Sequence, residues 1–219
     1  MNKLDRTEQR IVGVLIEKAL SVPDTYPMSE NALVDGCNQK NNRDPLMDVA
    51  GFQIAGALMS LHEKGWAARV EGSGRVAKFK HRVVEMLEVD NKELAVFAEL
   101  LLRGPQAPGA LKTRVQRMGN HGSVEDIEAM LRRFAEHLPP LVELLPLAPR
   151  EQQRRWRHLL GDGTEQHGAA PLATAAPETR LAAPAQASVV TPPDLVARVS
   201  ALERQVAELI QRMRGPLGD

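Results

Sequence analysis

Residues 48–82, DVAGFQIAGALMSLHEKGWAARVEGSGRVAKFKHR, change their hydrophobic period once along the stretch. In the first part Ile54, Leu58 and Leu61 recur at the spacing of one helix face. In the second part apolar and polar residues alternate on either side of a glycine-rich turn at 72–75. The stretch therefore predicts one helix that runs directly into a two-stranded hairpin.

Both ends of this predicted helix carry terminal signals. Asp48 is a good N-cap because its carboxylate can accept from free amides of the first turn. Gly65 follows the last periodic residue, where a left-handed residue is usual. The helix is therefore predicted to lie between these two residues, and the strand that follows the turn is basic.

Two more helices are predicted before this stretch. Asp5 and Glu8 have the spacing of a capping box, which marks the start of the first helix. Ser29 is a natural N-cap for a short second helix at about residues 30–38. The first part of the chain thus has the order helix, helix, helix, hairpin.

A run of polar residues separates the second and third helices. A segment this polar is expected to be a surface connection. One hypothesis is that it forms a binding surface with Lys40 and Arg43 as its charged members, and the alternative is that its asparagines satisfy helix ends and turn amides. The residues of this polar loop are Asn38, Gln39, Lys40, Asn41, Asn42 and Arg43.

The same order of elements then repeats. Helices are predicted at 91–102, at about 109–117 and from Ser123 onward, and two strands at 141–145 and 153–160. Three helices followed by a hairpin is the order of a winged-helix domain. We therefore predict a mainly α fold with small β hairpins, built from two tandem winged-helix domains at residues 1–90 and 91–162.

The last part of the chain has a different composition. Residues 163–193 are rich in Ala and Pro and poor in large apolar side chains, which predicts a disordered linker. Residues 194–214 predict a coiled-coil helix, and the pattern favours a parallel homodimer, with a trimer as the alternative. Its heptad seam consists of Leu195, Val199, Leu202, Val206, Leu209 and Met213.

The composition limits which classes of protein the chain can belong to. The 28 basic and 28 acidic side chains give no net charge, so a contact with nucleic acid has to rest on local patches. The single cysteine, Cys37, excludes an intramolecular disulfide and a cysteine-based zinc cluster within one chain. No apolar run approaches the roughly 20 residues that cross a bilayer, and the first ten residues carry acids, so we expect a cytoplasmic protein.

Four segments resemble the YceH-like family of bacterial proteins, whose function is uncharacterised. They are LDRTEQRIVGVLIEKAL at 4–20, YPMSENALVDGCNQKNNRDP at 26–45, EKGWAARVEGSGRVAKFKHR at 63–82 and ELAVFAELLLRGPQAPGALKTR at 93–114. The resemblance implies a tandem winged-helix fold over nearly all of residues 4–160. It implies no activity, ligand or catalytic residue.

The basic residues indicate where nucleic acid could bind. The outer face of the third helix has no Arg or Lys before Lys64, so base reading is not predicted. Two basic hairpins make contact with DNA phosphates the leading hypothesis, and Lys112, Arg114 and Arg117 add to them. The candidate residues are Arg69, Arg75, Lys78, Lys80 and Arg82 in the first hairpin, and Arg150, Arg154, Arg155 and Arg157 in the second.

The alternative function is a non-enzymatic protein-interaction module. In this interpretation the winged helices associate through the apolar outer face of the third helix, where Phe52 and Met59 lie. The six histidines show no metal-ligand spacing, and no Ser, Cys or Lys stands in a nucleophile motif. We therefore expect no enzyme activity, no cofactor and no metal.

Overall fold

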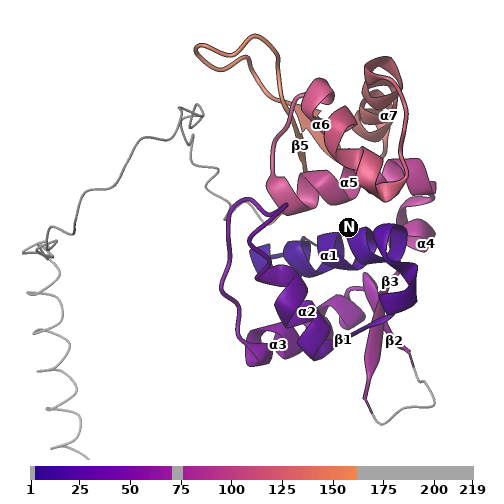
Figure 1. Cartoon of the computed structure of the whole chain (residues 1–219). Coiled ribbons are helices and arrows are strands. Elements are labelled where there is room, and N and C mark those ends of the chain that lie inside the picture. The colour runs from indigo at the N-terminus through magenta and orange to yellow at the C-terminus, as the bar shows by residue number, and fades with distance from the viewer. Residues whose placement is uncertain (1–2, 71–75, 162–219) are drawn as a thin grey trace, which may run out of the picture. The chain divides into compact units, whose positions relative to one another are not determined.

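The computed structural model describes residues 3–70 and 76–161. The chain divides into two units, Met1–Ala169 and Ala170–Asp219, and every described residue belongs to the first. That unit is mainly helical with small antiparallel sheets, which confirms the coarse fold class predicted from the sequence (Figure 1). The predicted linker and the heptad seam lie outside the described residues, so both stay predictions.

The first half of the unit follows the predicted order. Its elements are α1 (Arg6–Ser21), η1 (Pro23–Thr25), β1 (Met28–Ser29), α2 (Glu30–Cys37), α3 (Gly51–Glu63), β2 (Ala67–Val70) and β3 (Lys78–His81). The capping box before α1 is confirmed: the Asp5 carboxylate accepts from the Glu8 amide at 2.8 Å, and the Glu8 carboxylate accepts from the Asp5 amide at 2.7 Å. The Ser29 hydroxyl caps α2 by accepting from the Ala32 amide at 3.3 Å.

The start of α3 differs from the prediction. Its N-cap is Ala50, whose amide donates to the Gln53 side chain at 2.8 Å, and Asp48 is not the cap. The cause is a contact from the preceding helix. The Asn38 side chain donates to the Val49 carbonyl at 2.9 Å and accepts from the Val49 amide at 2.7 Å. This pair of bonds uses both backbone groups of Val49, so the helix begins after it.

The hairpin is part of a three-stranded antiparallel sheet with the order β1-β3-β2. Met28 of β1 pairs with Phe79 of β3, and both side chains are buried. Strand β1 has only two residues, which is too short to show an alternating pattern in the sequence. It ties the start of α2 to the hairpin.

After the short helix α4 (Val83–Leu87), the second half repeats three helices and a hairpin. The repeat consists of α5 (Asn91–Arg103), α6 (Pro108–Val115) with the 3-10 turn η2 (Gln116–Met118), α7 (Val124–Glu136), β4 (Val142–Leu144) and β5 (Trp156–His158). The capping box of α7 is confirmed, because the Ser123 hydroxyl and the Asp126 carboxylate each accept from the other's amide, at 3.1 and 2.8 Å. The short helix α4 was not predicted, and β4 and β5 are shorter than expected.

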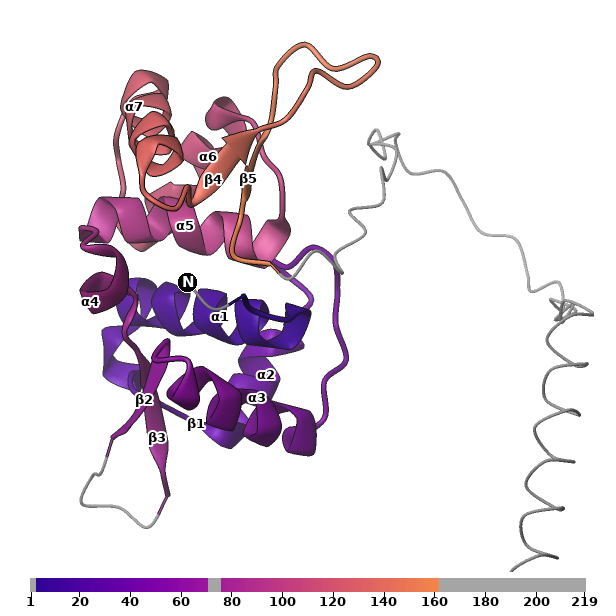
Figure 2. The same cartoon turned by 180° about the vertical axis from the view of Figure 1, so that it is seen from behind.

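Helices α1 and α5 lie side by side and join the two halves (Figures 1 and 2). Both helices are buried along most of their length. At Gly13 the two helices approach each other closely, because a Cβ atom there would lie 3.0 Å from Leu102 Cγ and Cδ2. The two ends of the described chain also meet, since the Leu4 amide donates to the Leu160 carbonyl at 2.8 Å. The two halves therefore share one core.

Candidate functional site

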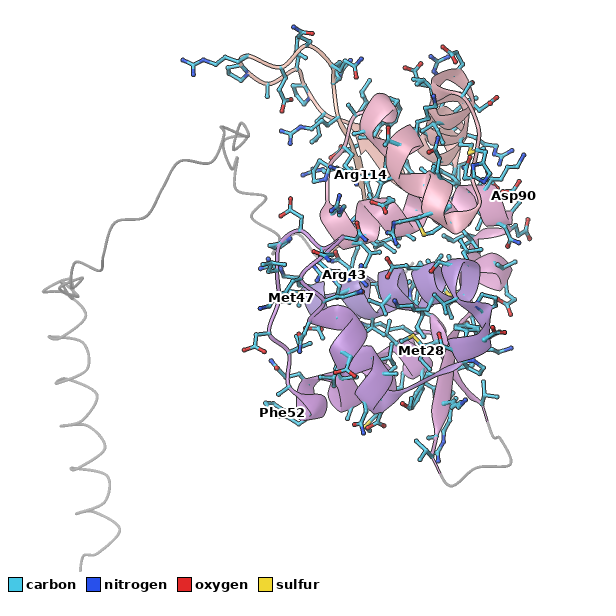
Figure 3. All side chains as sticks on the ribbon, viewed as in Figure 1. Met28, Arg43, Met47, Phe52, Asp90 and Arg114 are labelled. Atoms are coloured by element: carbon cyan, nitrogen blue, oxygen red, sulfur yellow. The ribbon has the colours of Figure 1, made fainter. Side chains whose placement is uncertain are left out.

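Helix α3 presents an apolar outer face. Ile54, Leu58 and Leu61 are buried as predicted, whereas the Phe52 and Met59 side chains are 79% and 69% exposed. Figure 3 shows Phe52 at the outer end of this helix, pointing away from the body of the unit. Side chains of this kind cannot read base edges by hydrogen bonding. The face is suited to an apolar contact.

The β2–β3 hairpin separates its basic residues onto two faces. Val70 pairs with Lys78 and Arg69 with Phe79, and paired residues in antiparallel strands point to the same side. Lys78 and Lys80 therefore share one face, and Arg69 lies on the other. Arg69, Lys78, Lys80 and Arg82 are all exposed, and none of the four forms an ion pair with a residue that the structure describes. Below they are the hairpin cations, and Arg75 lies outside the described residues.

The β4–β5 hairpin is different, because most of its arginines already have partners. Arg157 pairs with Glu143, and Arg155 Nε lies 3.2 Å from a Glu151 carboxylate oxygen. Arg154 donates through Nε to the Leu145 carbonyl at 2.8 Å. Arg150 is exposed in the connecting loop. The two hairpins are therefore not equivalent, because four exposed cations of the first, but only Arg150 and Arg154 of the second, form no ion pair with a described residue.

The polar loop after α2 is only partly a surface segment, which corrects the prediction. Lys40 and Asn41 are exposed, but the side chain of Arg43 is fully buried. Its guanidinium donates to the Glu17 carboxylate of α1, with the shortest N–O distance at 2.5 Å, and to the Gln39 side chain at 2.9 Å. Asn38 holds the backbone of Val49, as described above. The sequence alternative, in which the amides of this loop serve the fold, accounts for Asn38.

Arg43 is one member of a buried ion-pair network between the two halves. Arg117, in η2, forms one ion pair with Glu17 of α1 and another with Glu99 of α5. Glu17 and Glu99 are almost fully buried. Burial alone raises the pKa of Glu17, but the hydrogen bonds and charges of Arg43 and Arg117 outweigh it and hold that pKa below its usual range. Arg117 is therefore an internal residue rather than part of an open basic surface.

A further buried arginine lies beside this network. Arg10 of α1 donates to the carbonyls of Cys37 at 3.0 Å and Pro45 at 2.6 Å. Burial, reinforced by the charge of Arg43, lowers the pKa of Arg10 to about 10. No short motif in the sequence marks these charged residues. The only signal is that Arg10 and Glu17 directly flank the apolar residues of the same helix.

The other titratable groups of the described residues do not gather into a metal centre. Among the described residues, no group of three or more His, Cys, Asp or Glu side chains could hold a metal ion. His81 is half-buried against Tyr26, and burial lowers its pKa to about 4. Cys37 is buried, which raises its pKa to about 12. In the described part of the chain, no helix is long and apolar enough to cross a membrane.

Comparison with known proteins places the chain in a family. Residues 4–151 match the family described as "Protein of unknown function, DUF480". A UPF0502 protein of Hahella chejuensis is 38% identical over 212 residues, which cover 94% of each chain. A UPF0502 protein of Citrifermentans bemidjiense is 44% identical over 156 residues, covering 71% of this chain and 73% of the relative. The chain therefore belongs to the DUF480 or UPF0502 family of uncharacterised bacterial proteins.

Proposed function

We propose that this protein is a tandem winged-helix protein that binds duplex DNA through phosphate contacts made by the hairpin cations. The observation that carries the proposal is the contrast between the two hairpins. The four cations of the first are exposed and free of ion pairs with described residues, whereas Arg155 and Arg157 of the second are paired. The repeated order of three helices and a hairpin supports the winged-helix assignment.

The spacing of the cations suits a phosphate backbone. Residues i and i+2 of a strand lie roughly 6.5–7 Å apart, so Lys78 and Lys80 are separated by about twice the 3.4 Å axial rise per phosphate of one DNA strand. No comparable observation supports contacts between α3 and the edges of DNA bases. Helix α3 exposes Phe52 and Met59, and Lys64 at its end is bound to the Glu8 carboxylate at 2.7 Å. The proposed binding is therefore insensitive to sequence.

The test is the salt dependence of binding. Changing Lys78, Lys80 and Arg82 together to Ala should weaken binding to two unrelated duplexes equally, because phosphate contacts carry no sequence information. The slope of log K against log salt should become less negative by about 0.9 for each phosphate that the variant no longer neutralises. Fluorescence anisotropy between about 50 and 200 mM salt measures both quantities.

A matched control removes the same charge elsewhere. Lys40, Lys92 and Arg150 are exposed and lie outside the first hairpin. Changing these three to Ala should leave the salt slope unchanged if the hairpin binds the duplex. Equal losses of affinity in the two triple variants would mean that only net charge matters, and the hairpin would then have no special role.

A second candidate function is a non-enzymatic protein-interaction module, favoured by the exposure of Phe52 and Met59. Replacing both residues with Ser should abolish association with a protein partner while leaving duplex affinity intact. Association through an apolar face is only weakly sensitive to salt, whereas phosphate binding is strongly sensitive. The direction and the size of the change in binding affinity with salt therefore distinguish the two functions.

We also propose that residues 194–214 assemble the chain into a parallel homodimer through the predicted heptad seam. Analytical ultracentrifugation of the full chain should give the mass of a dimer, and a chain that ends at Gly163 should give that of a monomer. A full-length monomer at tens of micromolar would contradict the coiled coil. A truncated dimer would move the interface onto the winged-helix halves.

A further inference from the structure

We propose that Arg103 and Arg114 form a binding site for a phosphate-type oxyanion, separate from the first hairpin. Arg103 is the last residue of α5, and Arg114 lies near the end of α6. Figure 3 shows Arg114 and the loop at Arg43 on the same side of the unit, away from the β2–β3 hairpin. The inference does not depend on the proposed function.

Positive charge exceeds negative charge in this region. Arg43 and Arg117 are compensated by Glu17 and Glu99, which are the two buried carboxylates of the network. Arg10 and Arg103 also face the carboxylate of Asp44, which forms no ion pair within 4.0 Å with a described residue. The arginines of this region that form no ion pair with a described residue are Arg10, Arg103 and Arg114. An excess of this kind attracts anions.

The side chain of Arg103 forms no hydrogen bond or ion pair with a described residue. Glu99 lies one helical turn before it, but Arg117 binds one oxygen of that buried carboxylate. The Nε atom of Arg103 is buried and has no partner within the described part of the chain. Burial and the nearby charge of Arg114 lower the pKa of Arg103. Its guanidinium therefore has no ion pair with a described residue, although the charges of Glu99 and Asp44 partly offset the repulsion from Arg114.

Arg114 is held in place without being neutralised. Its guanidinium donates to the side-chain oxygen of Gln106, which is an uncharged acceptor. Gln106 is itself buried and fixed, because its side chain donates to the Glu99 carbonyl at 3.0 Å and its backbone pairs with that of Trp156 in both directions. A guanidinium oriented in this way keeps donors for a planar two-point contact, which matches phosphate geometry.

The charge of Arg114 disfavours the charge of Arg103, so an anion bound by both arginines would relieve this repulsion. A dianionic phosphate would compensate both charges and give Arg103 the acceptor that it lacks. The alternative is that the two arginines serve only the fold. If the two arginines serve only the fold, Arg103→Gln should lower the stability of the protein in the absence of phosphate. If they form an anion site, it should not, because the Arg103 side chain has no partner in the described structure to lose.

The test uses the full chain and inorganic phosphate. Titration calorimetry should show phosphate binding to the natural chain, and sodium phosphate should raise its melting temperature above that in sodium chloride of equal ionic strength. Changing Arg103 and Arg114 together to Gln should weaken phosphate binding by about tenfold or more, since both guanidinium groups are removed. In chloride, Arg103→Gln alone should leave the melting temperature unchanged or raise it.

Control variants and a second ligand complete the experiment. The Lys40→Gln and Lys92→Gln double variant removes two exposed charges and should bind phosphate like the natural chain. If a short DNA duplex displaces phosphate, the anion is supplied by a nucleic-acid backbone; if not, the site takes free phosphate or a small phosphorylated molecule. Absence of phosphate binding to the natural chain, or equal binding by the Arg103→Gln and Arg114→Gln double variant, would overturn the proposal.

Discussion

Glu17→Gln should lower the free energy of unfolding by about 3–5 kcal/mol, because it leaves a buried arginine without its counter-charge. The side chains of Arg43 and Glu17 are 0% and 3% exposed, respectively. Without the Glu17 charge, Arg43 would keep only uncharged acceptors, which are the carbonyls of Gly36 and Asn42 and the side chain of Gln39. Urea unfolding of the natural chain and the variant measures the difference.

Two further variants show whether burial of the ion pair causes the large loss of stability in Glu17→Gln. Glu128→Gln breaks an ion pair with Arg132 whose side chains are 41% and 68% exposed, and it should cost no more than about 1 kcal/mol. Adding Arg43→Met to Glu17→Gln should restore part of the stability, since an apolar side chain of similar length no longer needs a counter-charge. Equal losses for Glu17→Gln and Glu128→Gln would contradict the buried network.

The same ion pairs predict a dependence on pH. The folded pKa of Glu17 is depressed below its unfolded value, so the stabilisation that it supplies is complete above the unfolded pKa of about 4.3. That stabilisation is lost as the pH falls through the lower, folded pKa. The stability difference between the natural chain and Glu17→Gln should therefore be constant from about pH 6 to 8 and shrink below about pH 4. Urea unfolding of both proteins at each pH measures this difference.

The elements that could be predicted from the sequence have local causes. Both capping boxes join residues three positions apart, and the buried stripe of α3 repeats at the helical period. The antiparallel pair β2 and β3 follows from the alternation of apolar and polar residues on both sides of the predicted turn. The elements that were missed, β1 and α4, are too short to display a period. Asp48 failed as a cap because a side chain from the end of α2 determines where α3 begins.

The buried charges could not be predicted, because their partners are distant in the sequence. Glu17 binds Arg43, 26 positions away, and Arg117, 100 positions away. In the sequence, Arg43 belongs to a run of polar residues, and such a run usually lies on the surface. The loop after α2 brings Arg43 to Glu17, and the packing of η2 against α1 brings Arg117 to the same carboxylate. The sequence also suggested two similar basic hairpins, whereas the structure pairs Arg157 with Glu143, its cross-strand neighbour in β4 and β5.

The packing of α1 against α5 predicts that Gly13→Leu should also cost about 3 kcal/mol or more, since extra atoms have no space in a filled core. A Cβ atom at Gly13 would lie 3.0 Å from Leu102 Cγ and Cδ2 and 3.2 Å from Leu101 Cβ. These neighbours are themselves buried in α5, so they cannot turn toward solvent. The expected loss should appear in urea unfolding as a lower midpoint with an unchanged slope.

Gly56 in α3 provides a matched control, because it is also a helical glycine, but a Cβ atom at this position would have no neighbouring atom within 4 Å. Gly56→Leu should be neutral or stabilise the protein by up to about 1 kcal/mol, as leucine favours a helix more than glycine does. The two variants make the same chemical change, so their difference isolates the packing between α1 and α5. If Gly13→Leu were as harmless as Gly56→Leu, the two halves would not share a tightly packed core, and Arg117 would lose the rigid setting that lets it bind Glu17 and Glu99 together.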